Sequence, residues 1–286
     1  MSIYNRKTLV DAHLEGRVRR YVWRKSPSVS NTAGQWFDLS MSPGMPPPQY
    51  YIGSILTATA LARSTDKGLE HGPSVSPSKK FLTSISGMTS TSGGLPATFF
   101  LCDYLMFYPF IDMSETSRQD LTNVTTIPRY TTGTGVQVMA VLTNAGVGGQ
   151  SFYFVYTNSD GVASRTSQTV VMNTSTANGQ IITSSSGSRN QSGNPFIGLQ
   201  AGDSGVRSIE SVYMNGPDVG LFALVLVKPL MSFCIYETTA TYEKKCFDIN
   251  MDLPRIYDDA YLNLLCLPRA ALSSTVLVGD LEVIWE

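Results

Sequence analysis

The stretch from residue 96 to residue 111 is the densest apolar run in the chain, and it constrains the fold more than any other segment. Its aromatic residues are Phe99, Phe100, Tyr104, Phe107, Tyr108 and Phe110. Such a run has to be buried, either in a core or under a partner chain. A membrane-spanning helix needs roughly 20 mostly apolar residues, and Asp103 and Pro109 interrupt this run. Because aromatic residues favour strands and proline disfavours helix, we predict a central strand over residues 97–107 that ends before Pro109.

Regular strand signals continue through the second half of the chain, where short apolar runs alternate with polar turns. We predict strands over residues 135–142, 151–156, 162–172, 207–214, 220–227, 233–236, 259–266, 274–278 and 281–285. The Asn-Ser-Asp-Gly turn at residues 158–161 tolerates the positive φ that a tight hairpin requires. Many short strands with few helix signals predict an all-β fold, a β-sandwich or jelly roll.

The beginning of the chain differs in character from the remainder. Residues 1–25 hold seven basic residues against two acidic ones, a net charge of +5, whereas the rest of the chain carries −6. Asn5 is a candidate N-cap for a short helix, and the prolines in residues 41–48 exclude a helix or a central strand there. We predict an extended N-terminal arm over residues 1–50 and a jelly-roll-like sandwich body over residues 51–286.

The arm combines basic residues with widely spaced aromatic residues that could anchor it on another surface. The interface residues that we predict are Arg17, Arg19, Arg20, Trp23, Arg24, Trp36 and Phe37. Such a set also suits nucleic acid phosphates, but the arm continues into a proline-rich extended segment, which favours contact with protein. The partner is then a neighbouring chain or the acidic body of the same chain. Only 15% of the residues are charged, and a surface poor in charge suits repeated subunit contacts, or equally a secreted protein.

Residues that could carry catalysis are few and poorly spaced. The two histidines are His13 in the arm and His71 in a Gly/Pro loop, where we expect a solvated side chain; no Gly-x-Ser-x-Gly turn accompanies them. Asp258 and Asp259 would point to opposite faces of a strand and so form a poor carboxylate pair. Asp103 lies inside the aromatic run, where a buried carboxylate needs an arginine or a backbone amide as partner. We predict no catalytic residue.

Metal and cofactor binding have no support in the sequence. No group of histidines and cysteines has the spacing of metal ligands. Residues 248–252 place side-chain oxygens as a calcium loop does, but they lack the glycine and the final glutamate of an EF-hand. The glycine-rich stretches at 146–149 and 202–205 lack the Lys-Ser/Thr of a phosphate-binding loop, so we expect turns there. We predict neither a metal nor a cofactor.

The cysteines bear on the compartment. They are Cys102, Cys234, Cys246 and Cys266, each among apolar residues and none in a Cys-x-x-Cys pair. We expect buried free thiols, while a Cys234–Cys246 bridge across a hairpin is conceivable. The residues after Met1 contain no apolar run of a signal peptide. These features predict a product of the cytoplasm, where disulfides are rare, with no membrane partner.

Several stretches spread over nearly the whole chain resemble a family of tailed-bacteriophage virion proteins. They are residues 5–17, 36–44, 102–113, 128–133, 198–212, 220–229 and 258–263. The resemblance implies a non-enzymatic structural part of the virion that is made in the cytoplasm of the bacterial host. Combined with the jelly-roll fold and the extended arm, it favours a capsid decoration (cement) protein. The partners of such a protein are the major capsid protein and copies of itself, with a trimer expected.

Two alternatives stay open. Within the virion, the chain could instead belong to a head fibre, the neck or the tail, and the copy number per particle would distinguish these positions. A function of another class is a carbohydrate-binding jelly-roll module. That function needs an exposed aromatic platform, which Tyr50 and Tyr51, or Tyr153 and Tyr156, could supply.

Overall fold

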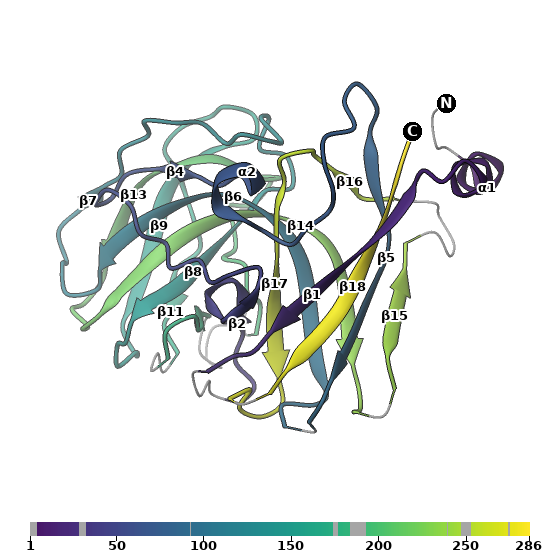
Figure 1. The fold of residues 1–286 in the computed structure, drawn as a ribbon. Helices are drawn as coiled ribbons and strands as arrows, with labels where there is room; N and C mark the ends of the chain where they lie inside the picture. Colours follow the sequence, from purple (N-terminus) through teal and green to yellow (C-terminus); the bar gives the residue numbers. More distant parts are fainter. Residues whose placement is uncertain are drawn as a thin grey trace.

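The computed structural model describes residues 5–28, 33–91, 93–173, 177–183, 193–238, 240–246, 253–273 and 275–286. In these ranges the chain forms three sheets of antiparallel strands with little helix (Figure 1). This arrangement confirms the predicted all-β, sandwich-type fold. The possible calcium loop at residues 248–252 lies outside the described residues.

The largest sheet has seven strands and lies in the middle of the molecule. In spatial order its strands are β12 (Ile181–Ile182), β8 (Gln137–Asn144), β14 (Leu221–Ile235), β6 (Ala97–Asp112), β17 (Tyr261–Pro268) and β2 (Phe37–Asp38), with β4 (Thr59–Ala60) also on β6. Each predicted strand of the second half falls in or beside a strand of one of the three sheets, apart from Ser274, which is not described.

Two smaller sheets pack on this central sheet. The six-stranded sheet has the order β15 (Tyr242–Lys245), β5 (Lys80–Thr89), β18 (Leu277–Trp285), β1 (Val18–Lys25) and β3 (Gly44–Met45), with β16 (Arg255–Ile256) also on β5. The five-stranded sheet has the order β10 (Arg165–Thr166), β9 (Ser151–Asn158), β13 (Val206–Met214) and β7 (Gln119–Asp120), with β11 (Val170–Val171) also on β9. The helical elements are α1 (Arg6–Leu14), η1 (Leu39–Met41) and α2 (Arg63–Asp66).

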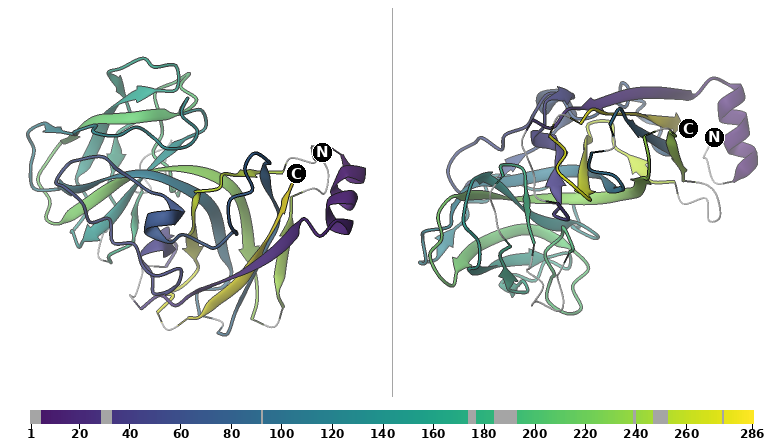
Figure 2. Two further views of the ribbon diagram at one scale, coloured as in Figure 1. Left: turned by 45° about the horizontal axis from the view of Figure 1, so that its top comes forward. Right: turned by 90° about the horizontal axis from the view of Figure 1, so that it is seen from below.

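Strands β6 and β14 are long enough to serve two lobes. They pair antiparallel from Leu221 opposite Asp112 to Ile235 opposite Ala97. One half of this pair packs against the five-stranded sheet, in a core that contains Phe154 and Ile209. The other half packs against the six-stranded sheet, in a second core. Figure 2 shows the two lobes with the β6–β14 pair running between them. A single hydrogen-bonded ribbon therefore joins both lobes.

Strand β6 continues beyond the end that its sequence predicts. Our expectation that the strand stops before Pro109 is wrong, because β6 extends to Asp112. The pairing with β14 shifts between Tyr108 and Ile111, so that Pro109 and Phe110 together face one residue of β14. Phe110 has a positive φ of 59°. A bulge of this kind tolerates a proline because the missing N–H falls where the ladder is already interrupted.

The predicted N-terminal helix forms with its cap. The Asn5 side chain accepts a hydrogen bond from the Thr8 amide at 2.9 Å, and the Asn5 amide donates to the Thr8 hydroxyl at 3.2 Å. Such a reciprocal capping box satisfies two of the free N–H groups at a helix start. The helix ends at Leu14, just before Gly16, whose φ is 71°. Leu9 and Ala12 pack on Ile284 of β18, which fixes the helix to the edge of the six-stranded sheet.

Asp103 of β6 finds both kinds of partner that its sequence context requires. Its fully buried carboxylate accepts two hydrogen bonds from the Arg129 guanidinium, at 2.8 and 2.9 Å, and one from the Tyr261 amide at 3.1 Å. Arg129 also donates to the carbonyls of Leu61 and Tyr104. Burial raises the pKa of Asp103, and Arg129 lowers it in part. This ion pair and its hydrogen bonds tie four segments together, and Asp103 lies between Leu101 of one core and Leu105 of the other.

We predict that Arg129→Met destabilises the protein by about 3–5 kcal/mol, because it leaves the Asp103 carboxylate buried without its counter-charge. Urea unfolding followed by circular dichroism measures this loss. The matched control is Arg118→Met, which removes the exposed Arg118–Asp120 ion pair and should leave the unfolding midpoint nearly unchanged, because solvent screens such a pair. Equal effects of the two substitutions would contradict the prediction.

Candidate interaction surface

The aromatic residues that the sequence predicts as anchors are buried in this chain itself. Strand β1 pairs with β18 from Val18 to Lys25, and Trp23 enters the core of that lobe. Trp36 packs against Phe100 of β6, with ring centroids 5.2 Å apart, and Phe37 pairs in the central sheet. In this structure Trp23, Trp36 and Phe37 are therefore almost wholly buried within their own chain. The chain's own sheets supply apolar faces within reach, so these contacts form without the cost of association.

Residues 36–61, which we call the covering segment, close over one face of the central sheet. Their apolar side chains join a core with residues of β6, β8, β14 and β17. The Asp38 carboxylate is buried in this segment and accepts hydrogen bonds from the Ser40 amide at 2.9 Å, the Ser40 hydroxyl at 2.7 Å and the Tyr104 hydroxyl at 2.7 Å. The Tyr51 hydroxyl donates a fourth. Because Tyr104 lies on β6, this carboxylate fastens the covering segment to the sheet. Burial raises the pKa of Asp38, and its donors lower it in part.

Lys25 forms a second buried link between β1 and the covering segment. Its ammonium donates to the carbonyl oxygens of Ser42 at 3.2 Å and Pro46 at 3.0 Å. Burial lowers the pKa of Lys25 to about 8, against the opposing influence of Asp38. Our sequence analysis missed both Asp38 and Lys25 as functional positions. The sequence feature that could have indicated a buried charge is a single charged residue between apolar residues, as in Trp36-Phe37-Asp38-Leu39.

The predicted arginines lie on or beside β1 and have unequal roles. Arg17 donates to the Trp285 carbonyl at 2.6 Å, and the Arg19 guanidinium lies 5.7 Å from the Trp285 ring. Arg20 faces three acidic side chains of the same sheet, Glu282 at 2.9 Å, Asp280 at 3.2 Å and Glu243 at 3.6 Å. For Arg20, the acidic body of the same chain is thus the partner. Arg24 is exposed, and no ion pair is found for it among the described residues.

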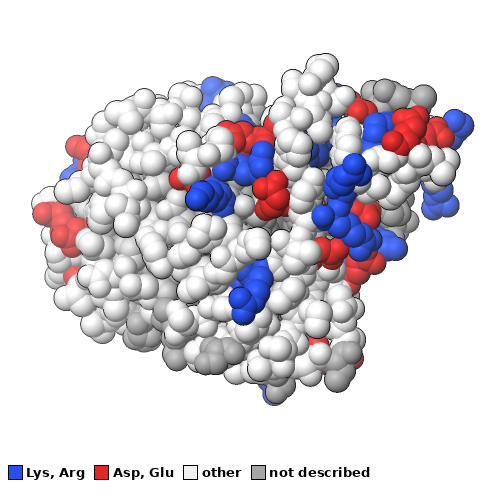
Figure 3. Space-filling view, in the orientation of Figure 1, with Lys and Arg blue, Asp and Glu red and all other residues white. Residues whose placement is uncertain are grey.

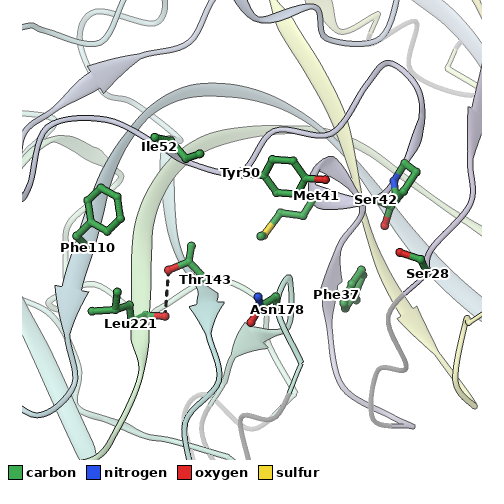
Figure 4. Close-up of a pocket in the computed structure, with 11 residues that line it drawn as sticks. Ser28, Phe37, Met41, Ser42, Tyr50, Ile52, Phe110, Thr143, Asn178 and Leu221 are labelled. Carbon is green, nitrogen blue, oxygen red and sulfur yellow. Dashed lines mark hydrogen bonds between the residues drawn. The ribbon is translucent and has the colours of Figure 1, made fainter.

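A hollow of about 340 Å³ opens between the covering segment and the central sheet. It is lined by Ser28, Phe37, Met41, Ser42, Pro43, Tyr50, Ile52, Phe110, Thr143, Asn178 and Leu221. Figure 4 shows these side chains facing one another from both structural layers, with the Thr143 hydroxyl bonded to the Leu221 carbonyl at 3.1 Å. None of the lining residues is charged. Tyr50 and Ile52 are also exposed at its rim.

The surface around this hollow carries few charges. Figure 3 shows Lys, Arg, Asp and Glu gathered over α1, the β1–β18 region and the neighbourhood of α2, whereas a broad area in the centre left is almost without them. In the same orientation the covering segment crosses the front of the molecule (Figure 1). Its exposed apolar side chains are Met45, Tyr50, Ile52 and Ile55. This uncharged face is the strongest candidate for an interaction surface, since binding there desolvates few charges.

His71 is fully buried, so our expectation of a solvated side chain is wrong. Its Nε2 bonds to the Ala260 carbonyl at 2.9 Å, and its Nδ1 lies 3.3 Å from the Lys80 Nζ. The carbonyl can only accept, so Nε2 carries the proton and Nδ1 accepts from Lys80. Lys80 also donates to the carbonyls of Gly72 and Pro73, which closes the loop over the edge of β5. The imidazole therefore has a structural partner on each nitrogen.

The described residues contain neither a metal site, nor a disulfide bond, nor a membrane-spanning helix. Among those residues, no group of His, Cys, Asp and Glu could hold a metal ion. The conceivable Cys234–Cys246 disulfide is not formed, and of the four cysteine thiols Cys102 and Cys266 are buried as expected, whereas Cys234 and Cys246 are only partly buried. None of the described helices has the length and apolar content that crossing a bilayer requires.

The tyrosines considered for a sugar platform do not form one together. Tyr51 and Tyr156 are buried. Tyr153 stacks on Tyr213 of the neighbouring strand, with ring centroids 5.0 Å apart and planes 9° from parallel. Each of these two rings thus has one face covered by the other ring. The Arg118 guanidinium lies 6.0 Å from the Tyr213 ring. Tyr50 alone is left exposed, at the rim of the hollow.

Comparison with known proteins yields no family. No protein-family model matches the chain, and no curated protein matches it. Among solved structures, a chain of the infectious bursal disease virus Gt strain has a TM-score of 0.20 and 8% identity, over 94% of this chain and 80% of that chain. A chain of T=1 particles derived from that virus has a TM-score of 0.21 and 10% identity, over 94% and 77%. These values are too low to say how the present chain folds or works.

We predict that stability falls as the pH drops from about 6.5 to 4, because of His71. Burial lowers the pKa of the folded-state imidazole from 6.5 to about 4, so in this window the unfolded chain binds a proton that the folded chain does not. The free energy of unfolding that is lost through His71 approaches about 3 kcal/mol near pH 4. Urea unfolding at a series of pH values measures it. His71→Gln should flatten the curve in this window, whereas the control His13→Gln, at an exposed site on α1, should not.

Proposed function

We propose that this chain is a structural protein of a virus particle, which works by binding neighbouring subunits through its surface. The observation that carries this proposal is the uncharged face with its apolar hollow. A subunit contact needs a surface whose desolvation costs little, with a few large side chains that fit a complementary partner. Tyr50 and Ile52 at the rim of the hollow are suited to that role.

The buried ionisable groups also support a structural role. The Asp38, Asp103 and His71 side chains each have hydrogen-bond partners that fix a segment or a loop. A catalytic acid or base has to reach a substrate, and these three groups have no exposed surface. The shifted pKa values of these three groups thus belong to side chains that hold the fold together.

The finer assignment is a capsid decoration protein of a tailed bacteriophage, bound to the major capsid protein and to copies of itself as a trimer. Its support is the resemblance of seven separate stretches to phage virion proteins. The exposed Arg19 and Arg24, which lie on opposite faces of β1, remain candidates for contacts with neighbours. The division into an arm of residues 1–50 and a body of residues 51–286 is part of this proposal. It describes which residues would reach adjacent subunits, while the described part of the arm packs on its own body here.

Quantitative mass spectrometry of purified particles of the virus that encodes this chain tests the proposal directly. A decoration protein should be present in hundreds of copies per particle, and a neck or tail component in far fewer. A density map of the intact particle would then give the position and the oligomer. Absence of the chain from purified particles would refute the structural role.

We predict that Tyr50→Asp combined with Ile52→Asp weakens binding to particles stripped of this protein by about 10- to 100-fold, as for the loss of interface hot spots. The two side chains are exposed, so the fold should persist with an unchanged unfolding midpoint. Co-sedimentation with the stripped particles measures the binding. Val162→Asp, in the turn between β9 and β10, changes an equally exposed apolar residue outside the hollow and should bind normally. Wild-type binding by the double variant would contradict the use of this face.

A further inference from the structure

Helix α1 carries an outward face on which apolar side chains are exposed. Val10 and Leu14 lie four residues apart and so share this face, and Leu14 is 81% exposed. The other exposed positions of the helix are Arg6, Lys7 and His13, and none of its exposed positions is acidic. Figure 1 shows α1 projecting from one end of the molecule. The face is therefore apolar in the middle with basic groups beside it, of which Lys7 pairs with Asp11 of the same helix.

A groove of complementary character lies near β7. It has a volume of about 600 Å³ and is lined by Ile55, Leu56, Phe110, Asp112, Glu115, Ser117, Arg118, Gln119, Asp120 and Leu221. Its apolar lining includes Ile55, which is 72% exposed. The rim holds three acidic residues and one arginine, and that arginine pairs with Asp120. No ion pair is found for Asp112 or Glu115 among the described residues, so an excess of negative charge remains available to a basic partner.

One chain cannot join these two surfaces to each other. The groove lies beside β7 at one end of the molecule, and α1 lies at the opposite end, as the views in Figures 1 and 2 agree. A second copy of the chain, however, brings its α1 to the groove of the first. Amphipathic helices commonly bind apolar grooves in this way, with charges at the rim setting orientation.

We infer that α1 of one copy docks in the acidic groove of the next, a head-to-tail contact between copies of this chain. Val10 and Leu14 enter between Ile55, Phe110 and Leu221, and Arg6 faces the acidic rim. Such a heterologous contact closes into a ring or continues as an open array, depending on the rotation between copies. A single helix buries little area, so each contact is weak and depends on repetition. The inference rests on the proposed structural role and names the contact that copies make.

Two complementary variants test this contact. Leu14→Glu disables the helix and leaves the groove intact, while Ile55→Glu does the reverse. Mass photometry and sedimentation velocity of the full chain should show wild-type oligomers that grow with concentration. Each variant alone should associate at least about ten-fold more weakly. An equimolar mixture should form dimers and nothing larger, because it contains one intact helix–groove pair and its outer ends are blocked.

The control and the contrary outcomes are distinct. Val162→Glu should assemble like the wild type, and circular dichroism should show that every variant is folded. Charge reversal with Arg6→Glu should weaken assembly, and Glu115→Arg on the other partner should restore it. If the wild type associates while both groove and helix variants associate equally well, or if the mixture stays monomeric, the inference is overturned. A wild type that is monomeric at all concentrations also overturns it, whereas the proposed structural role is judged separately by the particle content.

Discussion

The structure depends first on the backbone pairing of β6 with β14. These strands exchange hydrogen bonds along nearly their whole length, and both are buried on two faces for much of it. Their two halves belong to different cores, so neither lobe can be formed without the strands that complete the other. The Asp103–Arg129 pair lies where the cores meet. Loss of pairing there would separate the lobes, and we therefore expect them to unfold as one unit.

The covering segment depends on this sheet in turn and completes the candidate surface. The hollow combines Tyr50 and Ile52 from the segment with Phe110 and Leu221 from the β6–β14 pair. Asp38 and Lys25 hold the segment by polar contacts that are buried, and such contacts specify one position because any displacement leaves a charge without partners. The apolar core beneath supplies the larger stabilisation. The surface thus exists only while the segment is docked.

Particular residues show which parts of the fold could be predicted from the sequence and which could not. The strands of the second half were predictable because each apolar run lies between turn residues, and the Asn5 cap was predictable because capping is local. The continuation of β6 beyond Pro109 was not predictable, because a bulge depends on the pairing with the partner strand. The burial of His71 was not, since Lys80 and Ala260 close over it from other segments. Trp23, Trp36 and Phe37 were recognised as anchors, but a sequence pattern does not say whether an anchor binds its own chain.

The same reasoning explains why the hollow and the groove were both missed. Each unites the bulged end of β6 and the start of β14 with residues more than fifty positions away along the chain. Phe110 and Leu221 line both. The bulge that carries Pro109 thus turns an aromatic side chain out of the core toward two openings, which a regular strand would not do. If neighbouring subunits bind there, force between them enters the molecule at the end of the β6–β14 ribbon. Along that ribbon the force would be shared among the hydrogen bonds that pair β6 with β14.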